Sequence, residues 1–200
     1  MGKAKIAVLV SGGGTNLQAL IDAQKNGIIS SGEITLVIAN NAGAYALERA
    51  ANAGIKSAVV LKKECGSQAA FEQKIKDLLT QYSIDLIVLA GFMSILSEDF
   101  TRDYPERILN VHPSLIPSFC GAGFYGLRVH EEALRYGVKV TGATVHFVNE
   151  IPDGGEIIFQ KAVEIQEGDT PEILQRRVME QAEWKILPAA VEKISKQLVG

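Results

Sequence analysis

Length, composition and charge restrict the class of protein. The chain has 200 residues and a formal net charge of −3, from 20 basic and 23 acidic side chains. This length fits one domain with a substantial core. The balanced charge excludes the basic footprint of a protein that binds nucleic acid or an anionic membrane. With 47% hydrophobic and 22% charged residues, the composition is that of a soluble globular protein.

Cysteine usage and the first residues predict the compartment. Cys65 and Cys120 are the two cysteines, too few for a disulfide framework, and free thiols are typical of a reducing compartment. The apolar run Ile6–Val10 is too short for a signal sequence or a membrane span. No His/Cys cluster has metal-binding spacing. We expect a single domain over residues 1–200 in the cytoplasm that acts on small molecules, with no metal, nucleic acid or membrane as partner.

The first half of the chain alternates strand and helix patterns. Short apolar runs bounded by glycine are typical of strands buried on both faces, and amphipathic spacing predicts helices between them. Strands that alternate with helices form a parallel sheet with right-handed crossovers. The predicted strands are 5–10, 34–38, 57–61, 86–90 and 108–111, and the predicted helices are 17–27, 45–52 and 68–82.

The second half departs from this alternation. Gly142–Val148 and Ile157–Ile165 are predicted as two antiparallel strands joined by a loop. Thr170 at the N-cap and Pro171 at the first helical position predict a long final helix. We therefore expect an α/β fold with a Rossmann-like, mostly parallel sheet, helices on both faces, and antiparallel strands added in the C-terminal half.

A glycine-rich loop, Ser11–Asn16, follows the first predicted strand. Its backbone N–H groups, at a helix N-terminus, can bind an anion. A dinucleotide fingerprint is excluded because Leu17 occupies the third glycine position and the second strand ends in Asn40-Asn41 instead of an acid. A Walker A loop is excluded because no Gly-Lys-Ser/Thr follows. The loop is therefore either a small anion cradle or a tight turn that requires glycine.

Polar side chains lie at the carboxyl end of the strand predicted at 108–111. Asn110 and His112 are two residues apart on a strand and so point to the same side, at the end of the sheet where ligands of α/β folds bind. Asp153 lies in a Pro-Asp-Gly-Gly turn, which an ordinary turn also explains. Near His112 it would complete an amide, imidazole and carboxylate set suited to acyl chemistry. His130 is expected in a helix, at the surface or behind the site, and His146 inside the sheet.

Two further features each have a structural and a functional interpretation. Gly91–Ser97 is apolar where a loop should be polar. It therefore packs in the core or forms a wall for a flat, partly apolar ligand. Glu183, beside Trp184 in the final helix, is by itself expected to be a solvated acid.

Taken in chain order, these motifs resemble the phosphoribosylglycinamide formyltransferases, or GAR transformylases, of the folate-dependent formyltransferase family. The resemblance runs from residue 5 to about residue 190 and implies the formyltransferase fold. Single motifs would be weak, but their order and spacing make the similarity specific. The matching segments are Val10–Leu17, Leu89–Ser97, Ile108–Pro117 and Gly142–Val148, which leads to Asp153-Gly154-Gly155.

The resemblance implies a reaction and its partners. The formyl group of 10-formyltetrahydrofolate, as co-substrate, is transferred to the amine of N1-(5-phospho-D-ribosyl)glycinamide. The products are formylglycinamide ribonucleotide and tetrahydrofolate, in de novo purine biosynthesis. The expected partners are these small molecules, and the expected state is a monomer or homodimer.

The resemblance also implies residue roles. Asn110 would donate a hydrogen bond to the developing oxyanion and a protonated His112 a second one, while Asp153 would raise the histidine pKa. Glu183 would hold the substrate amine, and Asn149–Asp153 would contact the pterin. The implied phosphate-binding residues are Gly13, Gly14, Thr15 and Asn16, and the implied folate-binding residues are Gln68, Met93, Ser94, Ile95, Leu96 and Asn110.

Some positions depart from the family pattern, and other activities compete. Ser94 and Gln68 stand where arginines often contact the folate tail. The sequence therefore does not determine how tightly the glutamate carboxylates of the folate are bound. Formyltetrahydrofolate deformylase, a hydrolase, shares the trio but has His-His-Ser in place of His112-Pro113-Ser114. Methionyl-tRNA formyltransferase adds a C-terminal RNA-binding domain. A catalytically silent nucleotide-binding module is the alternative of a different class.

Overall fold

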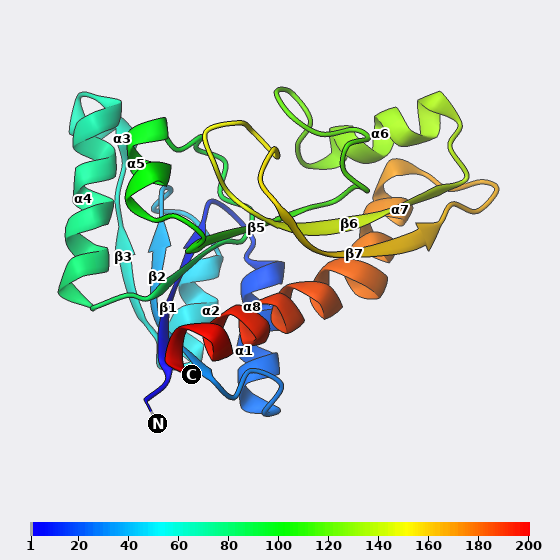
Figure 1. The fold of residues 1–200 in the computed structure, drawn as a ribbon. Coiled ribbons are helices and arrows are strands. Elements are labelled where there is room, and N and C mark those ends of the chain that lie inside the picture. The colour runs from blue at the N-terminus through cyan, green and yellow to red at the C-terminus, as the bar shows by residue number, and fades with distance from the viewer. Residues whose placement is uncertain (1) are drawn as a thin grey trace.

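The computed structural model describes residues 2–200, in which one seven-stranded sheet forms the centre (Figure 1). The strand order is β3-β2-β1-β4-β5-β6-β7. β1 to β5 pair in parallel, and β6 and β7 continue the sheet antiparallel to their neighbours. The strands are β1 Ala4–Val10, β2 Gly32–Ala39, β3 Lys56–Val59, β4 Leu86–Leu89, β5 Ile108–His112, β6 Val140–Phe147 and β7 Ile157–Glu164.

Helices cover both faces of this sheet, with α1, α2 and α8 on one face and α4 and α5 on the other (Figure 1). The alternation of β1 produces the two layers, because Ile6 and Val8 pack with α1 and α8 while Ala7 and Leu9 pack against α4. The helices are α1 Thr15–Lys25, α2 Ala46–Asn52, α3 Lys62–Cys65, α4 Gln68–Gln81, α5 Glu98–Asp103, α6 Leu127–Tyr136, α7 Pro171–Val178 and α8 Trp184–Val199, with a π-helical segment η1 Met179–Glu183 between the last two.

The predicted fold class is confirmed. The short helices α3 and α5 were not predicted, and the predicted final helix is interrupted by η1. α5 had a local signal: Ser97 Oγ accepts from Phe100 N at 3.2 Å, and acidic residues follow in the first turn. The final helix begins as predicted, at Thr170 and Pro171. It then contains the π-helical turn η1, which the sequence pattern did not predict. Such turns are rare and are frequently found at functional sites.

The topology determines where loops meet. From β1 the chain continues to β2 and β3 on one side of β1, and then crosses to β4 on its other side. The strand order therefore switches between β1 and β4. Ligands of open α/β sheets bind at the carboxyl ends of strands at such a point. Met93 N donates to Ser11 Oγ at 2.8 Å, which joins the loops after β1 and β4 directly.

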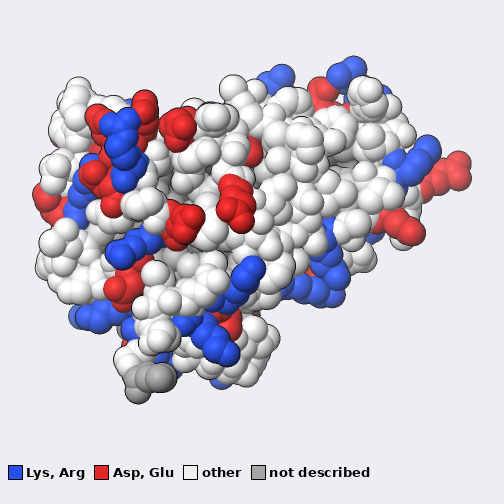
Figure 2. Space-filling view, viewed as in Figure 1, with Lys and Arg blue, Asp and Glu red and all other residues white. Residues whose placement is uncertain are grey.

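The surface in the view of Figure 2 mixes acidic and basic side chains instead of gathering one sign. Their density is highest over α4 and α5. Within residues 2–200, no helix is both long and apolar enough to cross a membrane.

Candidate active site

The structure brings Asn110, His112 and Asp153 together. Asn110 and His112 lie on β5, and Asp153 lies in the loop between β6 and β7. His112 Nδ1 is 3.5 Å from Asp153 Oδ2, and Asn110 Nδ2 is 3.5 Å from Asp153 Oδ1. A carboxylate 41 positions from the histidine in sequence (153 − 112) is thus its neighbour in space.

Backbone geometry holds Asp153 in this position. Asp153 has a φ of +57°, in the left-handed region. Gly121 N donates to its Oδ2 at 2.8 Å. Two residues on, a Cβ at Gly155 would lie 1.8 Å from Phe147 O. Only glycine therefore lets the loop return so closely to β6.

His112 is buried, and both of its ring nitrogens face acceptors. Nε2 is 2.8 Å from Phe119 O; a carbonyl can only accept, so Nε2 carries a proton and Nδ1 faces Asp153. Burial lowers the pKa of His112, while the Asp153 charge and the Phe119 bond raise it, and the net direction is down. The expectation of a raised histidine pKa is wrong, because the loss of hydration outweighs the nearby carboxylate.

His146 is a member of the site that sequence reasoning missed. Its Nδ1 lies 2.7 Å from Phe147 O, a carbonyl that can only accept, so Nδ1 carries a proton. Asn110 Nδ2 lies 3.2 Å from that Nε2, and Asp153 Oδ1 lies 3.5 Å from it. Asn110 and His146 are register partners across β5 and β6. The sequence indicated that His146 lies in a strand, but not the register that places it beside Asn110.

His130 lies on α6 as expected but is fully buried. Of the two expected positions, its burial excludes the surface and agrees with a place behind the site. Burial, and then the charge of His112, lower its pKa to about 4. His130 therefore stays neutral at pH 7.

Asp153 stays ionised at neutral pH. Burial raises its pKa, but His146, His112 and the Gly121 N–H together lower it more. The site therefore combines a carboxylate with a largely neutral His112. This pair can accept one proton from a reacting group.

The glycine loop forms the N-terminus of α1. Gly14 is the N-cap residue with a φ of +71°, and a Cβ there would lie 2.7 Å from Ala46 Cβ. Thr15 Oγ1 is 3.7 Å from Met179 Sδ. Asn16 directs its side chain away from a cradle, since Nδ2 donates to Glu183 Oε2 at 2.8 Å. The backbone N–H groups of this turn are left for an anion.

Glu183 is buried in η1 rather than solvated. Burial raises its pKa to about 7, against a lowering by the Asn16 hydrogen bond. The expectation of a solvated acid is wrong, because η1 turns Glu183 toward α1. The structure therefore joins the predicted phosphate loop and the predicted amine ligand through Asn16.

The raised pKa of Glu183 predicts a pH-dependent stability. The folded-state pKa of about 7 exceeds the ordinary 4.5, so the protonated form is favoured in the folded protein. That stabilisation is full below pH 4.5 and is lost as pH rises through 7. We expect Glu183→Gln, which is neutral at every pH, to raise the free energy of unfolding at pH 8 by about 1–3 kcal/mol.

Urea unfolding at pH 4.5 and pH 8 measures this difference. The matched control is Glu180→Gln, an exposed acid of the same η1 segment, which should change stability little at either pH. An equal change from Glu183→Gln at both pH values would contradict the raised pKa.

The segment after β4 is exposed in one part and packed in the core in another. Met93 is 55% and Ile95 72% exposed, whereas Leu96 is buried. The predicted wall therefore fits the first two, and core packing fits the third. Asn40 Nδ2 donates to Ser94 Oγ at 2.9 Å, and Gln68 Nε2 donates to Ile95 O at 3.1 Å. A pocket of about 510 Å³ is lined by the segment Met93–Ser97 together with Lys62 and Gln68.

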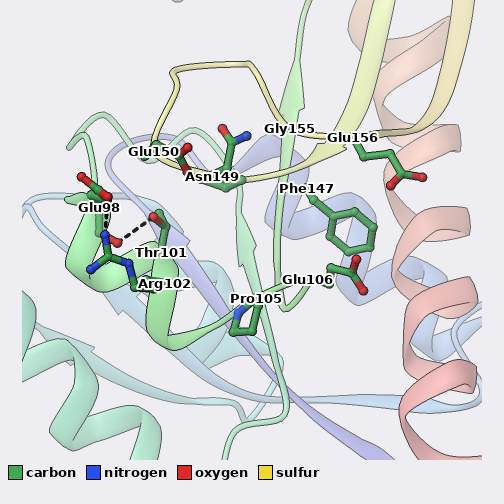
Figure 3. Close-up of a pocket in the computed structure, with 11 residues that line it drawn as sticks. Glu98, Thr101, Arg102, Pro105, Glu106, Phe147, Asn149, Glu150, Gly155 and Glu156 are labelled. Carbon is green, nitrogen blue, oxygen red and sulfur yellow. Dashed lines mark hydrogen bonds and ion pairs between the residues drawn. The ribbon is translucent and has the colours of Figure 1, made fainter.

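A second pocket, of about 430 Å³, borders the loop that carries Asp153 (Figure 3). Asn149, Glu150 and Gly155 of that loop form one side, and α5 faces them with Thr101 and Arg102. Acidic side chains dominate its charged lining: Glu98, Glu106, Glu150 and Glu156. Among residues 2–200, no group of three or more His, Cys, Asp and Glu side chains could hold a metal ion.

Comparison with known proteins gives a consistent result. The family model for formyl transferase matches residues 4–191. The phosphoribosylglycinamide formyltransferase of Haemophilus influenzae is 44% identical over 188 residues, which are 94% of this chain and 85% of that protein. The trifunctional purine biosynthetic protein adenosine-3 of Gallus gallus is 48% identical over 193 residues. The chain spans 18% of the length of that relative.

A solved structure agrees in fold as well as sequence. Glycinamide ribonucleotide transformylase 1 from Symbiobacterium toebii superposes with a TM-score of 0.91 at 42% identity. The match covers 98% of this chain and 89% of that one. With the family match over residues 4–191, this shows that the chain belongs to the formyl transferase family.

Proposed function

We propose that this chain transfers the formyl group of 10-formyltetrahydrofolate to the amine of N1-(5-phospho-D-ribosyl)glycinamide, in purine biosynthesis. One observation carries the proposal: Glu183 and the glycine loop are joined by the 2.8 Å hydrogen bond from Asn16. A substrate with a phosphate at one end and an amine at the other needs these two sites close together. The similarity to phosphoribosylglycinamide formyltransferases of other organisms supports the same reaction.

The substrate phosphate binds at the loop and the amine at the carboxylate. N–H groups of Gly13, Gly14, Thr15 and Asn16 face the phosphate with the favourable field of α1. Glu183, ionised above about pH 7, holds the amine. This arrangement orients the nucleophile before reaction, which contributes rate through proximity.

The trio performs the transfer. Asn110 Nδ2 lies 3.2 Å from His146 Nε2 and 3.5 Å from Asp153 Oδ1. The hydrogen of the longer contact turns from Asp153 to the oxygen that gains charge as the amine attacks the formyl carbon. The amine loses a proton as the new C–N bond forms. Asp153, or His112 Nδ1 beside it, accepts that proton and returns it to the folate nitrogen when the old C–N bond breaks.

The two pockets fit the two ends of a folate. The pterin is bound beside Asn149–Asp153, where the acidic pocket of Figure 3 offers acceptors for its N–H groups. Met93 and Ile95, both exposed, provide apolar surface for the benzoyl ring. Lys62 is the cation of the 510 Å³ pocket after β4, in which Ser94 and Gln68 carry no charge. The tail carboxylates are therefore bound by Lys62.

Loss of Lys62 should affect the folate tail alone. We expect Lys62→Ala to raise KM for the polyglutamated donor about 2- to 5-fold, the size of an exposed ion pair. KM for a donor that lacks glutamate should not change. Lys63→Ala is the matched control, since Lys63 is adjacent and exposed but does not line the pocket. Equal effects of both variants, or an effect on the glutamate-free donor, would contradict this assignment.

One assay tests the function. The protein is incubated with 10-formyltetrahydrofolate, with and without the glycinamide ribonucleotide, and tetrahydrofolate release is followed. We expect release to require the ribonucleotide and to match formylglycinamide ribonucleotide formed. Release without it would point to a deformylase, and none in either case to a silent binding module.

We propose that residues 1–200 act as one formyltransferase domain in the cytoplasm, as a monomer or homodimer. The substrates supply the reacting groups, and the chain's own side chains supply the polarisation and proton transfer described above.

A further inference from the structure

The outer side of the glycine loop is held by α2. Ala46 N donates to Gly12 O at 3.1 Å, and Arg49 Nε donates to Gly13 O at 2.8 Å. Two consecutive carbonyl groups of the loop therefore point toward α2. The close packing of Gly14 against Ala46 brings the same helix against the start of α1.

This arrangement fixes the direction of the N–H groups. In a trans peptide, the carbonyl of one residue and the N–H of the next point in opposite directions. With the Gly12 and Gly13 carbonyls turned to α2, the N–H groups of Gly13 and Gly14 point away from it. Consecutive N–H groups on one side form a concave anion site.

Two further contacts hold the Arg49 side chain in place. Its Nη1 donates to Gln18 Oε1 on α1 at 3.0 Å. Its guanidinium lies 5.0 Å from the centroid of the Tyr45 ring, a distance at which a cation is attracted to the ring. One side chain thus connects α2, the loop and the first turns of α1, and adds a positive charge behind the loop.

We propose that Arg49 is a positioning residue of the phosphate site, which orients the Gly13 and Gly14 N–H groups through the Gly13 carbonyl. The inference rests on the proposed function. It assigns to α2 a part in substrate recognition that the sequence motifs did not include.

Kinetics of Arg49→Ala test the proposal. We expect KM for the ribonucleotide to rise about 10- to 100-fold, the range for a lost charge-assisted hydrogen bond. The kcat and KM for the folate donor should stay near wild type. The reaction of a glycinamide riboside that lacks the phosphate should be unchanged. Arg49→Lys keeps the charge and one donor and should recover part of the loss.

The matched control is Arg135→Ala, an exposed arginine of α6, which should change none of these constants. An equal loss from Arg49→Ala with and without the substrate phosphate would overturn the proposal. So would an unchanged KM for the ribonucleotide.

A binding measurement separates this inference from the proposed function. Inorganic phosphate is titrated while the backbone amide resonances of Gly13 and Gly14 are followed by NMR. We expect shifts at both amides in the wild type, and much weaker binding in Arg49→Ala. Wild-type protein that shows this binding but no formyl transfer would defeat the proposed function alone. Equal phosphate binding by wild type and Arg49→Ala would overturn the role of Arg49, whatever the activity.

Discussion

Replacing Asn110 with alanine should lower kcat by on the order of 10²–10³, the usual cost of losing one oxyanion donor. The amide nitrogen lies 3.2 Å from His146 Nε2 and 3.5 Å from Asp153 Oδ1, and the hydrogen of the longer contact can turn to the developing charge. The charge exists only in the transition state. KM for the ribonucleotide should therefore change much less than kcat.

Steady-state kinetics with a thermal unfolding control measure this effect. Asn52→Ala, at the exposed end of α2, is the matched control and should leave kcat unchanged. Near wild-type turnover by folded Asn110→Ala would exclude the proposed role. Asn110→Asp should be worse than alanine, because a carboxylate would repel both the oxyanion and Asp153.

Replacing Asp153 with asparagine should lower kcat by on the order of 10²–10⁴, the range for a group that transfers a proton. The substitution keeps the shape and an oxygen that can accept from Gly121 N, which lies 2.8 Å from Oδ2. It removes the proton acceptor and the charge that supports protonation of His112. The pKa of His112, already lowered by burial, should therefore fall further.

Two measurements are combined for this prediction. Turnover gives the loss of rate, and an NMR pH titration of the His112 ring gives the direction of the pKa change. The control is Asp99→Asn, a surface acid of α5 that is 89% exposed, for which both should match wild type. A folded Asp153→Asn variant with a raised His112 pKa would contradict the electrostatic account.

Most of the fold could be predicted from local sequence. Short apolar runs bounded by glycine predicted the parallel strands, β1 among them, and a period of about 3.6 predicted the helices between them. The capped ends at Thr170 and Ser97 are also local signals. α3, with four residues, is too short to show a period.

The candidate site was predictable in part. Asn110 and His112 follow from their position at the end of β5, because neighbouring strands end at the same edge of a parallel sheet. Asp153 was indicated by the family resemblance, because an ordinary turn also explains its motif. The contact of Asp153 with His112 at 3.5 Å depends on how the loop folds back on β6. The order of residues in the sequence does not predict that distance.

The sequence by itself therefore determined the order of elements, the two buried faces of the sheet and the motifs at the carboxyl ends of its strands. The tertiary structure alone decided the lowered pKa of His112, the buried Glu183 and the contact of His146 with Asn110. The physical reason is that a pKa depends on total burial and on charges brought together from distant segments, whereas periodicity reports only neighbours along one element. The register of β5 against β6 and the π-helical turn η1 are such long-range features.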